Sequence, residues 1–188
     1  MRHWLLRPHG NCPYCSLVAE DVNHVLKCTH EQAQNLNKEA LCKLFEKLMK
    51  IGTCAKTVLA IKQELIAWRD GKRMHDTGML PILLRKVIKE QRKVGWRAFI
   101  DGLFVREWKE YQREYFEYIG SQKGAALYVI KAIHVCWDYN MYLWSARKLH
   151  KTERLQELED KKEMIEAVKK EYKIGLGRLP VYGFSEIF

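Results

Sequence analysis

The stretch CPYCSLVAEDVNHVLKC, which begins at Cys12 and ends at Cys28, decides how the start of the chain folds. Cys12 and Cys15 are separated by two residues, so both thiolates can reach one ion from a tight turn. His24 and Cys28 are four residues apart, and a helix that begins near Asp21 places them one turn apart on one face. Together the four side chains predict a closed Cys3His zinc site without a vacant position for a substrate. Such a site is structural and not catalytic.

Three catalytic interpretations of this stretch and the residues directly after it are possible, and each lacks a required part. Cys-Pro-Tyr-Cys is also typical of a glutaredoxin-type redox centre, which needs alternating strands and helices and a cis-proline opposite the thiols. The later prolines, Pro81 and Pro180, lie in no strand-like run. A zinc deaminase needs His-x-Glu before its cysteine pair, and none is present. His30-Glu31 begins an HExxH motif, but Gln34 stands where the second histidine belongs.

Two further alternatives stay open at this point. Four ordinary side chains can lie close together by chance, although their spacing fits a ligand set. Within the zinc interpretation, His30 is the alternative to His24 as the nitrogen ligand. We favour His24 because it lies one helical turn from Cys28.

The composition indicates a folded, basic protein. The chain has 188 residues, of which 47% are hydrophobic and 30% charged, so a packed core is expected. The net charge of +10 suits an acidic partner such as nucleic acid. No apolar run approaches the roughly 18 residues of a membrane span, and the first residues are too short for a signal peptide. We therefore expect no membrane partner and an intracellular location, in the nucleus or cytoplasm. The three cysteines outside the zinc set are expected to be small buried hydrophobes: Cys42, Cys54 and Cys136.

The hydrophobic periodicity predicts an all-α fold with a small zinc knuckle at the N-terminus. Gly52, Gly71, Gly95 and Gly120 interrupt the pattern, and Thr53 is expected to cap the helix that it precedes. Amphipathic helices are predicted at about 31–51, 53–71, 80–95, 96–115 and from 121 onward.

Three parts are expected along the chain: a zinc knuckle at 1–30, a helical domain at 31–150, and a charged helix with a C-terminal tail at 151–188. In the second part, His134 is expected to be a packed core histidine. The last long helix of that part is expected to bury Ala126, Ile130, Ile133, Trp137, Met141 and Trp144. The charged helix over 151–173 has a thin apolar seam that can pack on a partner, made by Leu155, Leu158, Ile165, Val168 and Tyr172.

A basic segment gives the strongest sign of nucleic-acid binding in the sequence. Residues 85–113 hold nine basic and four acidic side chains. Phosphate contacts need only positive charge, so we predict contacts to RNA or DNA backbones here without base recognition. The candidate contact residues are Arg85, Lys86, Lys89, Arg92, Lys93, Arg106, Lys109 and Arg113.

The Cys-Pro-x-Cys pair, followed by Glu20-Asp21 and by His24-Val-Leu-x-Cys28, resembles the zinc-binding domain that follows the reverse transcriptase of non-LTR retrotransposons. The later Trp137-Asp138, Trp144 and Arg147, ahead of His150, are similar to a tryptophan-rich region of related elements, particularly those of algae and diatoms. The resemblance gives Cys12, Cys15, His24 and Cys28 the ligand role.

The resemblance implies a piece of an element protein that holds RNA or DNA near a polymerase. The reverse transcriptase or another element protein is then a partner. The chain has no Asp-Asp pair on a hairpin, so we expect a C-terminal fragment or a separate accessory domain. No acid, base and nucleophile set has a recognisable spacing, and the expected function is therefore non-catalytic. The alternative is a helical scaffold for protein–protein interactions with a structural zinc site.

Overall fold

The computed structural model describes residues 10–74 and 76–178, with side chains as far as residue 170. The described part of the protein is mostly helical and contains no strand, and its β contact is an isolated bridge between Asn11 and Ala19. The predicted all-α class is confirmed. The C-terminal tail predicted after the last helix falls largely on 179–188, outside the described residues.

The chain forms two units, residues 1–146 and 147–188. The first unit contains both the cysteine-rich segment and a set of packed helices, and the second contains the charged helix. The division predicted at residues 30 and 150 stays a prediction.

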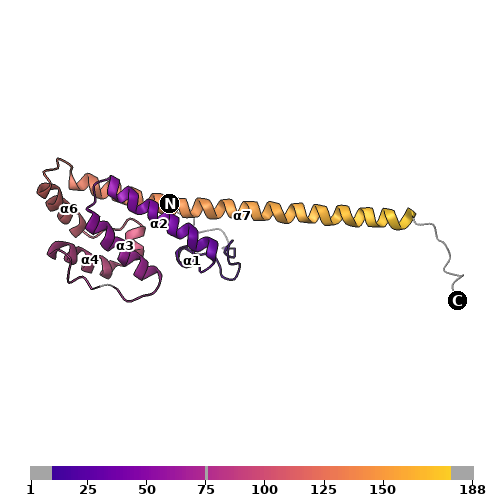
Figure 1. Ribbon diagram of the computed structural model, residues 1–188, viewed down its shortest axis with the longest axis horizontal. Coiled ribbons are helices and arrows are strands. Elements are labelled where there is room, and N and C mark those ends of the chain that lie inside the picture. The colour runs from indigo at the N-terminus through magenta and orange to yellow at the C-terminus, as the bar shows by residue number, and fades with distance from the viewer. Residues whose placement is uncertain (1–9, 75, 179–188) are drawn as a thin grey trace. The chain divides into compact units, whose positions relative to one another are not determined.

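Seven helices follow one another in the described part of the chain (Figure 1). Gly95 lies between two of them at φ +102°, a conformation that side chains other than glycine rarely adopt. The helices are α1 Val22–Lys27, α2 Glu31–Lys50, α3 Ala55–Arg69, α4 Ile82–Val94, α5 Trp96–Ile100, α6 Glu107–Tyr118 and α7 Ala125–Arg178. The helices predicted near 31–51, 53–71 and 80–95 are thus present.

The prediction of a single helix over 96–115 is wrong, because α5 ends at Ile100 and α6 begins at Glu107. Gly102 in this break has φ +90°, and a Cβ there would lie 2.9 Å from Nε1 of Trp137. The same Nε1 donates a hydrogen bond of 3.1 Å to the carbonyl oxygen of Asp101. The close approach of Trp137 therefore requires glycine at residue 102, and the turn separates the two helices.

The capping role predicted for Thr53 is also wrong. Its hydroxyl pairs with the phenol of Tyr128 at 2.9 Å in the core, and α3 has no side-chain hydrogen bond at its N-terminus. The hydroxyl of Thr53 can pair with Tyr128 because α7 brings this tyrosine against the turn between α2 and α3. A buried phenol needs a hydrogen-bond partner, and a threonine hydroxyl supplies it.

The first unit is built around aromatic side chains from α5 and α6. The ring centroid of Phe99 lies 5.3 Å from that of Trp96 and 5.7 Å from that of Trp108. These three side chains are almost completely buried. Leucines and isoleucines from α2, α3 and α4 complete the core, among them Leu44, Leu48, Ile61, Leu65, Leu84 and Ile88.

A buried amide ties α4 to the turn and to α6. Oε1 of Gln91 accepts hydrogen bonds from Nε1 of Trp108 at 2.9 Å and from the backbone N–H of Val105 at 3.2 Å. Its Nε2 donates to the carbonyl oxygens of Leu103 at 3.2 Å and Gly95 at 3.3 Å. All hydrogen-bonding capacity of this fully buried side chain is thus used.

The buried face of α7 in the first unit differs from the predicted one. Ala126, Ile130, Trp137 and Met141 are exposed, and Ile133 and Trp144 are half-buried. Tyr128 and Tyr139 occupy the core instead, so the stripe is displaced around the helix. The buried residues are Tyr128, Ala132, Val135, Cys136, Tyr139 and Leu143.

Two smaller expectations on buried side chains are corrected as well. His134 is not a core histidine, since it is exposed and stacks on Trp137 with ring centroids 5.4 Å apart. Cys42 is exposed because α2 turns that side to solvent, and Cys54 is half-buried at a helix end. The burial predicted for Cys136 is confirmed.

In the second unit, the side chains of residues 151–170 are all exposed, as predicted for a solvated helix. Five of them are large and apolar: Leu155, Leu158, Met164, Ile165 and Val168. The predicted seam residue Tyr172 has its side chain outside the described part. Among the described helices, none is both long and apolar enough to cross a membrane.

Replacing Gln91 by alanine is predicted to lower the free energy of unfolding by about 3–5 kcal/mol, because it leaves the N–H groups of Trp108 and Val105 and the carbonyl oxygen of Leu103 without these partners in the core. Gln63→Ala, an identical change at an exposed position of α3, should cost less than about 0.5 kcal/mol. Urea unfolding followed by circular dichroism measures both. Equal stabilities for the two variants would contradict the role given to Gln91.

Candidate metal centre

A tight loop brings Cys12 and Cys15 to one side of the chain. The backbone N–H of Cys12 donates to the carbonyl oxygen of Val18 at 2.8 Å, and that of Ser16 donates to Cys12 at 2.9 Å. Ser16 has φ +57°, in the left-handed region, which lets the chain reverse directly after Cys15. The two sulfurs therefore face the same space, as their spacing predicted.

The short helix α1 supplies the other two side chains. Asp21 precedes it and accepts a hydrogen bond of 2.6 Å from the backbone N–H of His24 through Oδ1. This side-chain cap fixes the start of the helix at the predicted place. The N–H of Cys28 donates to the carbonyl oxygen of His24 at 2.8 Å, which places the two residues one turn apart.

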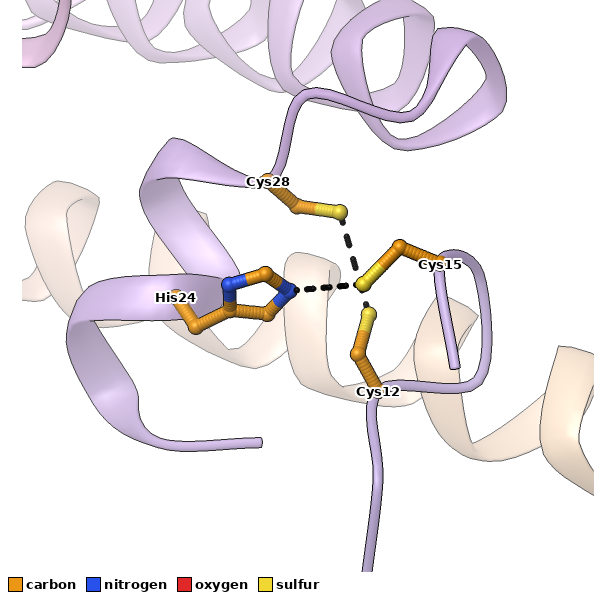
Figure 2. A group of neighbouring side chains, drawn as sticks. All are labelled: Cys12, Cys15, His24 and Cys28. Carbon is orange, nitrogen blue, oxygen red and sulfur yellow. Dashed lines mark hydrogen bonds between the residues drawn. The ribbon is translucent and has the colours of Figure 1, made fainter. Parts of the chain in front are cut away.

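The four side chains converge on a common point (Figure 2). Sγ of Cys12, Cys15 and Cys28 and a ring nitrogen of His24 all lie within 4.8 Å of one another. The sulfurs of Cys12 and Cys28 are 3.8 Å apart, and Cys15 Sγ lies 3.3 Å from Nε2 of His24. Cys12 and Cys28 are buried, and the other two are half-buried. Three thiols and an imidazole in this arrangement could hold a metal ion.

The alternative ligand, His30, lies outside the group. Its ring stacks on Tyr14 with centroids 6.1 Å apart, and its Nδ1 is buried without a hydrogen-bond partner among the described residues. Its backbone N–H donates to Cys28 instead. His30 therefore contributes to the surroundings of the site through its main chain.

Burial is the main reason that the pKa of the Cys28 thiol is raised above its ordinary value. The neighbouring Cys12 and Cys15 raise this pKa further, because two thiolates so close repel each other. The backbone N–H of His30 acts in the opposite direction, since it stabilises the thiolate. A metal cation would reverse this balance, because metal ligation requires deprotonated sulfur.

The candidate metal centre is joined to the helical core of the first unit. Val25 and Leu26 of α1 are buried in the main core. Nδ2 of Asn37 on α2 donates to the carbonyl oxygen of Val25 at 3.3 Å, and Arg97 on α5 donates to that of Val22 at 2.9 Å. The loop is thus held from several directions.

The basic residues predicted to contact phosphate have different surroundings. Arg92 belongs to the core: it forms a bidentate ion pair with Glu64, with Nε and Oε2 2.8 Å apart. Glu64 is buried and also accepts a hydrogen bond of 3.0 Å from Nε1 of Trp96. Arg85 donates to the carbonyl oxygens of Gly78 and Leu80. These two arginines therefore have structural partners.

Three more of the residues predicted to contact phosphate form ion pairs with an acidic side chain three or four positions away in the sequence. The pairs are Lys93 with Glu90 at 2.6 Å, Arg106 with Glu110 at 3.1 Å and Arg113 with Glu117 at 3.8 Å. In the described part of the chain, Lys86, Lys89 and Lys109 are exposed and have no acidic partner. The spacing of Lys86, Lys89 and Lys93 places these lysines in one row along α4.

The structure brings together a second basic group that the sequence did not indicate. A groove of about 430 Å³ beside Cys28 is lined by Lys27, Lys38, Arg69 and Lys72, together with the carboxylate of Asp70. Asp70 pairs with Nε of Arg69 at 2.8 Å and with Lys72 at 3.2 Å, and the arginine is the larger cause of its lowered pKa. The lining of the groove thus includes four cations and one carboxylate.

No charge run could have revealed this groove. Its cations come from the end of α1, from α2 and from the end of α3 and the residues after it. Lys27 additionally lies over the ring of Trp68, with Nζ 4.9 Å from the centroid. Only the packing of α1 against α2 and α3 gathers residues so far apart in the sequence.

His24→Ala is predicted to lower metal affinity by more than about 100-fold, since it removes a ligand, whereas removing groups beyond the ligands costs 10–100-fold. His30→Ala is the matched control, because it removes an imidazole next to the group but outside it. Elemental analysis of the purified variants should give one metal per chain for the wild type and for His30→Ala. Loss of the metal from His30→Ala alone would contradict the ligand set.

Comparisons of the chain with models of known protein families, with curated proteins and with solved structures found no match.

Proposed function

We propose that this protein is a non-catalytic, zinc-stabilised module that binds the phosphate backbone of RNA or DNA. The observation that carries the proposal is the groove beside Cys28, whose lining includes one carboxylate and four cations, those of Lys27, Lys38, Arg69 and Lys72. Phosphate recognition of this kind needs a concentration of positive charge and no base-specific geometry. The net charge of +10 acts in the same direction.

Zinc is the metal that best suits the donor set. A tetrahedral zinc ion with Zn–S near 2.3 Å and Zn–N near 2.0 Å separates two sulfurs by about 3.8 Å, and a sulfur and a nitrogen by about 3.5 Å. The corresponding distances here are 3.8 Å for Cys12 to Cys28 and 3.3 Å for Cys15 to His24. Four protein ligands leave no position for a substrate, so the zinc would stabilise the fold and take no part in a reaction.

The groove supports phosphate binding because its cations are held near one another before any ligand arrives. Arg69 and Lys72 share Asp70, and Lys27 is placed by its contact with Trp68. A strand that exchanges its counterions for these side chains gains free energy from the released ions. The row of lysines on α4 offers a second set of contacts of the same kind.

The resemblance found in the sequence suggests a biological context for this module. The Cys-Pro-x-Cys pair and the His-Val-Leu-x-Cys run resemble those of the zinc-binding domain after a non-LTR retrotransposon reverse transcriptase. In that setting the protein would hold element RNA or DNA, with the reverse transcriptase or another element protein as partner. A nuclear or cytoplasmic location belongs to the proposal, because the ligand sulfurs must stay reduced to bind zinc.

Charge reversal separates the two basic sets. Lys38→Glu with Lys72→Glu alters the groove, and Lys86→Glu with Lys89→Glu alters the row on α4. Each double variant is predicted to weaken binding of a labelled single-stranded RNA or a DNA duplex at least about tenfold at low salt. The slope of log affinity against log salt should fall by about 0.7–0.9 for each phosphate that the variant no longer neutralises. Fluorescence anisotropy across a salt series measures both quantities.

Lys50→Glu with Lys123→Glu is the control, since both lysines are exposed, belong to neither set and change the net charge equally. Arg92 is left unchanged in this test because its replacement would leave the buried carboxylate of Glu64 without its cation. Wild-type protein that does not bind either nucleic acid at low salt, or a control pair that weakens binding as much as the other two, would contradict the proposal.

A helical scaffold for protein–protein interactions is the second candidate. The exposed apolar side chains of the charged helix favour it, because isolated apolar side chains on a solvated helix gain free energy when a partner covers them. The salt series distinguishes the two functions, since a scaffold has no appreciable affinity for nucleic acid at low salt.

A further inference from the structure

The second unit presents an apolar seam that no described side chain covers. Leu155, Leu158 and Ile165 are 54%, 50% and 51% exposed. They recur at steps of three and seven residues, which is the spacing of the inward a and d positions in a coiled coil. With Leu155 at a and Leu158 at d, the next core positions are Lys162 at a and Ile165 at d. An apolar stripe this narrow fits the seam of a second helix.

The residues that flank the seam carry opposite charges on its two sides. Arg154 and Lys161 fall at g, and Glu159 and Glu166 fall at e. In a parallel pair of identical helices in register, each g residue faces the e residue five positions later in the partner helix. Arg154 then meets Glu159 of the second copy, and Lys161 meets its Glu166. Every g to e contact over this stretch joins a base to an acid.

The same charges disfavour the antiparallel arrangement. Antiparallel helices place g opposite g and e opposite e, so Arg154 and Lys161 would face basic residues, and Glu159 and Glu166 would face acids. Like charges at these positions repel and so select against that orientation. The flanks of the seam therefore specify both the partner and its direction.

We propose that two copies of this chain associate through a parallel, in-register coiled coil over residues 154–168. This inference is independent of the proposed function. Lys162 at an a position places two ammonium groups beside each other in the pair, which weakens the association and favours two strands over three. Dimerisation would double the number of phosphate-binding surfaces on one particle, and so raise the effective affinity for a long nucleic acid.

The first test uses the full chain with charges exchanged across the seam. One variant carries Glu159→Lys and Glu166→Lys, and the other carries Arg154→Glu and Lys161→Glu. Sedimentation equilibrium should show self-association of the wild type, at least tenfold weaker self-association of each variant, and restored pairing in an equimolar mixture. The restored mixture also excludes misfolding as the reason for the weaker association of each variant alone.

The second test concerns the core of the seam. Lys162→Leu is expected to tighten self-association by about tenfold or more, because it replaces the repelling layer by an apolar one. Glu163→Leu adds the same side chain one position further on, outside the seam, and should leave association unchanged. A wild type that stays monomeric up to about 1 mM overturns the proposal. So does a dimer that both charge variants leave intact, or one that Lys162→Leu fails to strengthen.

Discussion

Three sulfurs and one imidazole within 4.8 Å of one another are the arrangement on which the start of this protein depends. Only some of the apolar side chains in residues 10–28 are buried. The loop that carries Cys12 and Cys15 contributes only to a small cluster with Cys28 and Ala33. Without a cation, thiolates this close to one another repel. A bound metal supplies the free energy that such a small segment cannot gain from burial.

The order imposed at this centre extends into its surroundings. Cys28 ends α1 and at the same time lines the basic groove, so any displacement of the ligand moves one wall of that groove. Val25 and Leu26 connect α1 to the main core, and Asn37 fixes its backbone from α2. The position of Lys27 relative to Lys38 and Arg69 therefore depends on the fold of the metal-binding loop.

The helix α7 divides its apolar residues between two uses. In the first unit, Tyr128 and Tyr139 enter the core, where the hydroxyl of Thr53 pairs with the phenol of Tyr128, while Trp137 and Met141 remain at the surface. In the second unit, the side chains of residues 151–170 are all exposed, and most of them are charged. One continuous helix thus includes a stretch stabilised by burial and a stretch in which Leu155, Leu158 and Ile165 remain available to a partner.

The sequence by itself determined the features that arise from local spacing. The Cys-x2-Cys turn, the capped turn from Asp21 to Cys28 and the helices α2, α3 and α4 follow from interactions within a few residues. Tertiary structure decided the rest. It places His30 outside the group of metal ligands and pairs Arg92 with Glu64. It also separates α5 from α6 at the turn that contains Gly102, and it brings the four cations of the groove together. These outcomes depend on which surfaces pack together, because burial changes the environment of a side chain without changing its place in the sequence.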